Sequence, residues 1–149
     1  MEQSAEGTRP RQGNTLIFLG MLLFLLGLLI GIVVPFMANP RMGLSSHLEG
    51  VMNGMFLMLL GMIWPRIDLS PRWTRITYWL AIYGTFANFL GIALAAIFDA
   101  GKMLNIAAGG KEGPALAEGI VTFCLITLTV AMIMVSVLAL IGLRRHLRS

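Results

Sequence analysis

Charged side chains are the scarcest feature of this sequence. Lysine, arginine, aspartate and glutamate together make up 12% of the 149 residues, whereas 57% are hydrophobic. A soluble domain carries about 25% charged residues, so this composition argues for a membrane protein. The formal net charge of +4 comes from basic residues beside apolar runs. They form no patch on a soluble face, so no nucleic-acid partner is expected.

Cysteine and histidine are also rare. The chain has one cysteine, Cys124, and two histidines, His47 and His146. A single cysteine excludes a disulfide framework within the chain, and a zinc ion takes three or four protein ligands. Because the two histidines are expected on opposite sides of the membrane, a zinc ion held by this chain is not expected.

Long apolar runs are abundant. Four of them reach the length of about 20 residues that a membrane-spanning helix needs, at residues 15–37, 46–64, 73–98 and 115–143. The first is expected to be a retained helix, and the short connections force neighbours to run antiparallel. The sequence therefore predicts an all-α, polytopic membrane protein: one domain over residues 1–149, folded as an antiparallel four-helix transmembrane bundle.

The distribution of basic residues predicts the orientation. One end of the predicted bundle carries Arg9, Arg11, Arg66, Arg72, Arg75, Arg144, Arg145 and Arg148. The other end carries Arg41, Lys102 and Lys111. Since cytoplasmic loops hold an excess of lysine and arginine, both termini are predicted to be cytoplasmic, with the bacterial inner membrane as the expected location.

The second apolar run begins with unusually polar residues. His47, Glu49 and Asn53 stand at the predicted start of a membrane helix, where polar groups cost free energy and therefore mark function. Glu49 also has a structural interpretation. Ser46 followed by Glu49 matches a capping box, in which the glutamate bonds back to the serine N–H in the first turn.

Glycines follow His47 along the same helix. At about 100° per residue, Gly54 and Gly61 fall nearly in line with His47, and Gly50 falls about 60° to one side. Such glycines predict a groove beside the imidazole that suits a flat apolar ligand such as haem, for which one histidine is a common axial ligand. Alternatively, His47 is an interfacial polar residue and the glycines are helix contacts.

Three further polar residues are candidates for function or for structure. Asn88 lies in mid-span of the third run, where a carboxamide needs a partner across a helix interface, and Tyr83 is nearby. Glu118 opens the fourth run, where its carboxylate complements the helix dipole. It is expected at the same membrane level as His47.

The segment Ser46 to Met55, SHLEGVMNGM, resembles the signature of the hydroxylaminobenzene mutases, a small membrane family related to the styrene oxide isomerases. The shared pattern is a histidine, five residues and then Asn-Gly-Met. An ungapped count also places Asn88 where the relatives carry an asparagine in the third helix. The resemblance extends over roughly residues 16–143.

The resemblance implies an isomerase that converts hydroxylaminobenzene-type arylhydroxylamines to 2-aminophenols. It implies a homotrimer with haem b between protomers, its iron bound by His47 and acting as a Lewis acid on a small aromatic substrate. The other expected partner is membrane lipid. Asn53 would orient the substrate. The expected catalytic residues are Asn53, Asn88, Tyr83, Glu49 and Glu118, and the expected cofactor-binding residues are His47, Gly50 and Gly54.

Two other functions stay open. An epoxide-to-aldehyde isomerase of the styrene oxide type would use a tyrosine, but the matching position here is Ile92, so that group is either missing or supplied by another residue, of which Tyr83 is one candidate. A non-enzymatic haem-carrying or scaffold subunit is the other alternative. Membrane cytochromes that pass electrons usually have two axial histidines, whereas only His47 lies on its side of the membrane.

Overall fold

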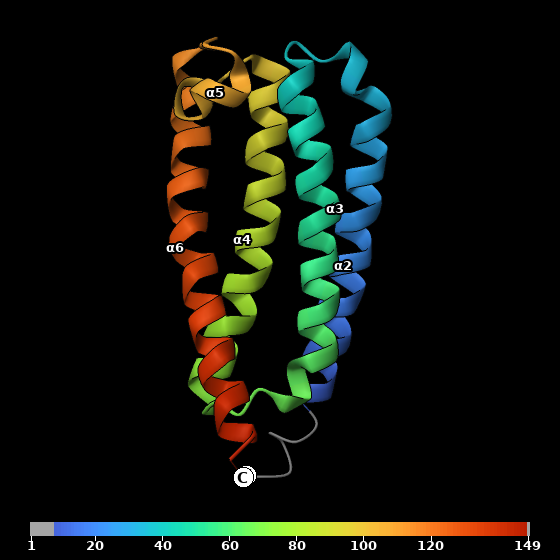
Figure 1. Ribbon diagram of the computed structural model, residues 1–149, viewed down its shortest axis with the longest axis vertical. Helices are drawn as coiled ribbons and strands as arrows, with labels where there is room; N and C mark the ends of the chain where they lie inside the picture. Colours follow the sequence, from blue (N-terminus) through green and yellow to red (C-terminus); the bar gives the residue numbers. More distant parts are fainter. Residues whose placement is uncertain (1–7, 149) are drawn as a thin grey trace.

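Within residues 8–148, which the computed structural model describes, four long helices run antiparallel to their neighbours in sequence (Figure 1). They are α2 (Thr8–Val33), α3 (Pro40–Ile63), α4 (Pro71–Phe98) and α6 (Ala115–His146). The short elements are η1 (Val34–Phe36), η2 (Trp64–Arg66), η3 (Lys102–Leu104) and α5 (Asn105–Ala108). Each long helix has the length and apolar composition to cross a membrane, which confirms the predicted fold class.

The helices lie in the order α2, α3, α4, α6, and the main contacts are between successive helices. The central pair is the more buried: 39% of the most apolar stretch of α3 and 56% of that of α4 are buried, against 17% for α2 and 22% for α6. Helices α3 and α4 therefore form the interior of the bundle, and α2 and α6 form its sides.

Glycines form the seam between α2 and α3. They face one another in three successive pairs, Gly13 with Gly61, Gly20 with Gly54, and Gly27 with Gly50. A Cβ atom added to Gly50 would lie 2.5 Å from the Cα of Gly27, closer than real Cβ contacts. The two backbones therefore touch directly, as small residues allow in membrane helices.

Helix α3 starts earlier than the sequence analysis predicted. It begins at Pro40 and not at Ser46, and Asn39 is its N-cap, accepting the Met42 N–H at 3.2 Å. Asparagine at the cap and proline at the first helical position are a strong start signal. The predicted capping box is wrong, because Ser46 is inside the helix and donates to the Phe89 carbonyl of α4 at 3.3 Å.

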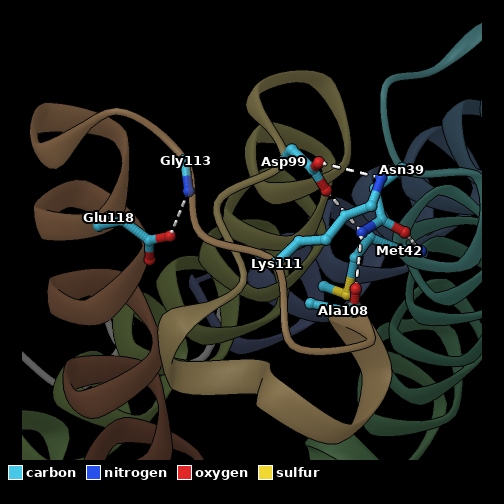
Figure 2. Close-up of polar contacts among 7 residues, drawn as sticks. All are labelled: Asn39, Met42, Asp99, Ala108, Lys111, Gly113 and Glu118. Atoms are coloured by element: carbon cyan, nitrogen blue, oxygen red, sulfur yellow. Dashed lines mark hydrogen bonds and ion pairs between the residues drawn. The ribbon is translucent and has the colours of Figure 1, made fainter.

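The connection between α4 and α6 covers the end of the bundle where α2 and α4 end and α3 and α6 begin (Figure 1), and Figure 2 shows its polar contacts. The Asn39 amide donates to Asp99 at 2.7 Å and to the Ala108 carbonyl at 3.1 Å, and Lys111 pairs with Asp99 at 3.2 Å. The Asn39 hydrogen bond, together with Lys111, holds the pKa of Asp99 below its ordinary value. These contacts join α3, α4 and the connection, and we call them the loop clasp.

Candidate functional site

Glu49, Asn53 and Asn88 form one hydrogen-bonded cluster in the seam between α3 and α4. The Asn53 amide nitrogen donates to Oε2 of Glu49 at 3.0 Å, and the Asn88 amide nitrogen donates to the same oxygen at 2.6 Å. Asn53 follows Glu49 by one turn of α3, whereas Asn88 comes from α4. The partner that the sequence required for Asn88 is therefore the carboxylate of Glu49, and we call these three residues the carboxamide cluster.

The carboxamide cluster lies deep along the helices. Glu49 is roughly 13 Å along α3 from Pro40, at a rise of about 1.5 Å per residue, so it is far from the helix end where the capping box would have placed it. Asn53 is 8% exposed. A carboxyl group at this depth in a membrane helix is costly, which makes Glu49 a candidate functional residue.

His47 faces the other side of α3. Its Nδ1 lies 2.8 Å from the carbonyl oxygen of Gly27 on α2, and a carbonyl can only accept, so Nδ1 carries the ring proton. The lone pair of Nε2 is then free to bind a metal. A Cβ atom on Gly31 would lie 2.8 Å from Nδ1. Helix α2 therefore fixes both the tautomer and the position of the imidazole through Gly27 and Gly31, which the sequence analysis did not identify as part of the site.

The groove expected beside His47 is filled by α2 within this chain. A Cβ atom on Gly54 would meet the backbone nitrogen of Phe24 at 2.6 Å, and one on Gly61 would meet the Gly13 carbonyl at the same distance. Gly50, Gly54 and Gly61 are helix contacts here. The expectation of an open groove along these glycines is wrong, because periodicity identifies a face but not the neighbour that covers it.

His47 is nevertheless suited to bind a cofactor that needs a single protein ligand and lies against the surface of the chain. Its side chain is only half-buried, so its own chain does not enclose it. In the described part of the chain, no three His, Cys, Asp or Glu side chains are grouped closely enough to hold a metal ion. A haem needs one such ligand, and a histidine whose other nitrogen donates to a backbone carbonyl is the usual arrangement.

Glu118 belongs to a separate cluster (Figure 2). Its carboxylate is 8% exposed and accepts the backbone N–H groups of Gly113 at 2.8 Å and Lys102 at 3.1 Å. These bonds tie the connection before α6 to the first turn of that helix. The described hydrogen-bond partners of Glu118 are thus backbone groups of the neighbouring loop, and Glu118 makes no contact with the carboxamide cluster.

Tyr83 also lies apart from the carboxamide cluster. It precedes Asn88 by five residues, which is about 140° around the helix, and its hydroxyl is hydrogen-bonded to Thr127 of α6. Ile92 is one turn beyond Asn88 and 5% exposed. The position that the family pattern gives to a tyrosine is therefore apolar and buried, and Tyr83 points elsewhere.

Four helices long and apolar enough to cross a membrane, with a carboxyl group and two carboxamides hydrogen-bonded between two of them, define a polytopic membrane protein with a polar cluster between its helices. The chain belongs to the styrene oxide isomerase family, whose model matches residues 12–144.

Two relatives narrow the activity. The hydroxylaminobenzene mutase HabB of Ectopseudomonas oleovorans is 53% identical over 130 residues, covering 87% of this chain and 79% of that protein. The hydroxylaminobenzene mutase HabA of the same organism is 47% identical over 127 residues, covering 85% and 94%. No solved structure matches the chain. The family and these relatives establish that the chain is an isomerase of the mutase type.

Proposed function

We propose that the chain isomerises arylhydroxylamines of the hydroxylaminobenzene type to 2-aminophenols. The observation that carries the proposal is the 53% and 47% identity to two proteins named hydroxylaminobenzene mutases, over most of the chain. The carboxamide cluster supports it by offering hydrogen-bonding groups to a small polar function on an aromatic ring, inside an otherwise apolar seam.

The reaction sets clear requirements for the protein. The N–O bond breaks, a C–O bond forms at the ortho carbon, and a proton moves from that carbon to nitrogen, so there is no net oxidation. The oxygen must be kept near the ring and water must be kept from the electron-poor carbon. A site between membrane helices, away from the aqueous phases, would meet the second need, and hydrogen bonds with Asn53 and Asn88 that orient the N–OH group would meet the first.

Haem b is the cofactor we propose, with the Nε2 atom of His47 as its protein ligand. The Gly27 carbonyl and the bare backbone at Gly31 would hold the imidazole in place for it. When bound, the iron supplies Lewis acidity toward the substrate oxygen.

We also propose a homotrimer in the bacterial inner membrane, with both termini in the cytoplasm and haem between protomers. Two observations support an interface site: His47 is half-buried, and it lies about 200° around α3 from Glu49. A single chain therefore does not bring the imidazole and the carboxamide cluster to one face. Light scattering of the detergent-solubilised protein would measure the number of protomers, and a monomeric active enzyme would contradict the trimer.

The test combines spectroscopy with turnover. The detergent-purified protein is given hydroxylaminobenzene, 2-aminophenol is measured by chromatography, and absorption spectra are taken before and after dithionite. We expect 2-aminophenol and a Soret band, and we expect His47→Ala to lose both. Absence of 2-aminophenol from a folded, haem-replete preparation would contradict the activity, whereas turnover by a haem-free preparation would contradict the cofactor.

A second candidate activity is the conversion of an aryl epoxide to an aldehyde, which the family match favours. The buried Ile92 weighs against it, because it offers no hydroxyl where the family pattern has a tyrosine. Styrene oxide offered to the same preparation tests this alternative. A kcat/KM for styrene oxide above that for hydroxylaminobenzene would make the epoxide the better substrate class.

A further inference from the structure

The carboxamide cluster is joined through a single atom. Oε2 of Glu49 accepts from Asn53 on its own helix and from Asn88 on α4. One carboxylate oxygen thus connects two side chains from two helices. Each amide would lose its own bond to this oxygen if it turned, so one carboxylate orients both side chains.

This arrangement decides which atoms the two amides present to a ligand. A carboxylate oxygen only accepts, so both asparagines must turn their NH2 groups toward Glu49. Their carbonyl oxygens are then directed away from it. In the described part of the chain no group donates to either Oδ1 atom. Since no buried side-chain oxygen or nitrogen lacks a partner, these two oxygens are not sealed inside the chain but reach its accessible surface.

Two unpaired acceptors in an apolar membrane interior cost free energy until a donor meets them. An arylhydroxylamine carries two donors on adjacent atoms, one N–H and one O–H. An aryl epoxide carries none and would leave both carbonyl oxygens unpaired. Each NH2 group keeps a second hydrogen, which can bond either ligand, so the difference between the two substrate classes rests on the carbonyl oxygens.

We propose that Glu49 is a positioning residue that fixes the Asn53 and Asn88 carbonyl oxygens, and that the cluster thereby selects substrates with an N–H and an O–H donor. The inference rests on the proposed function and deepens it by naming the feature of the substrate that is recognised. Sites built to hydrogen-bond a substrate group reject analogues that lack it far more strongly than apolar pockets reject a change of size.

The test compares hydroxylaminobenzene with its N-methyl analogue, which lacks the N–H, in the wild type, Glu49→Ala and Glu49→Gln. We expect Glu49→Ala to reduce kcat/KM for hydroxylaminobenzene by about 100-fold and to reduce the preference for it over the N-methyl analogue by at least about 10-fold. Glu49→Gln keeps an oxygen acceptor at the same length and should restore most of the preference. Because each variant is compared on both compounds, the extra bulk and intrinsic reactivity of the analogue cancel.

Glu112→Ala is the matched control, since this glutamate is exposed in the connection before α6 and should leave the preference unchanged. If Glu49→Ala lowers both rates equally, Glu49 has a merely structural role and the inference is wrong. If the wild type turns over neither compound, the proposed function fails by itself. Calorimetric binding of the two compounds then decides the inference: a binding preference lost in Glu49→Ala supports positioning, and one unchanged in that variant overturns it.

Discussion

Helix α3 has two seams that are held together by different means. Toward α2, paired glycines let the backbones of the two helices touch. The only polar side-chain contact described above in this seam is the hydrogen bond from His47 to the Gly27 carbonyl. Toward α4, side chains make the contact: Ser46 bonds the Phe89 carbonyl, and Glu49 joins Asn53 to Asn88. The glycine seam depends on shape, whereas the α3–α4 seam depends on hydrogen bonds. Substitution of the glycines in the first seam should therefore affect stability, whereas loss of Asn53 in the second should affect turnover.

The largest effect should come from the polar side. Asn53→Ala removes a carboxamide that we place against the substrate, and turnover should fall about 100-fold or more, the usual loss when one oriented hydrogen-bonding group is deleted from an active site. Haem content and the thermal midpoint should change little. Kinetics and absorption spectra check this, with Thr129→Ala as the control, because that hydroxyl bonds only its own helix at Leu125. Unaltered turnover would remove Asn53 from the mechanism.

The next effect should be on the glycine side. Gly54→Ala forces a Cβ atom against the Phe24 nitrogen at 2.6 Å, and overpacking of this kind costs about 1–3 kcal/mol. Gly119→Ala is the matched control, because a Cβ atom there meets nothing within 4 Å and alanine favours a helix over glycine by about 0.5–1 kcal/mol. Thermal unfolding in detergent should show opposite signs. Equal midpoints for the two variants would mean that the glycine seam is not tightly packed in solution.

A smaller effect is expected where the α3–α4 seam is structural. Ser46→Ala deletes the hydrogen bond to the Phe89 carbonyl, and the loss of one such bond costs about 1 kcal/mol. The midpoint should fall modestly while kcat and KM stay close to the wild type. A large loss of kcat in this variant would show that Ser46 takes part in turnover as well as in the packing of α3 against α4.

The smallest effect should be the pH response of the loop clasp, which lies outside both seams. The pKa of Asp99 is lowered in the folded protein by the Asn39 hydrogen bond and by Lys111. Its contribution to stability is therefore present above the ordinary pKa of an aspartate, about 4, and is lost as the pH falls through the lowered value. Thermal midpoints at neutral and acidic pH should differ less in Asp99→Asn than in the wild type; an equal difference would exclude Asp99 as the cause.

The sequence allowed the fold to be predicted because four apolar runs and their basic flanks are local features. It failed at the start of α3. Asn39 and Pro40 are a cap and a first helical residue, but the predicted helix began at Ser46, which put His47 in its first turn. Recognising the Asn-Pro pair would have moved His47 about two turns into the membrane.

The candidate site was predicted only in part. That Asn88 needed a partner followed from its depth, but that the partner was Glu49 depends on how α3 and α4 are set against each other. The hydrogen bonds of Glu118 could not be predicted either. Its two donors are backbone N–H groups of a loop, and nearly every residue type has such a group, so no residue type in the sequence points to them. Periodicity correctly placed Gly54 in line with His47. It could not show whether that face of α3 binds a ligand or packs against α2.

The imidazole of His47 rests on main-chain atoms of α2, and not on side chains that change rotamers. Bilayers of different thickness change the tilt of membrane helices. Because glycine contacts run along α2 and α3 from Gly13 to Gly31, the two helices should tilt as one body. The free nitrogen of His47 would then keep its place relative to both helices, which makes this part of the site insensitive to the thickness of the membrane around it.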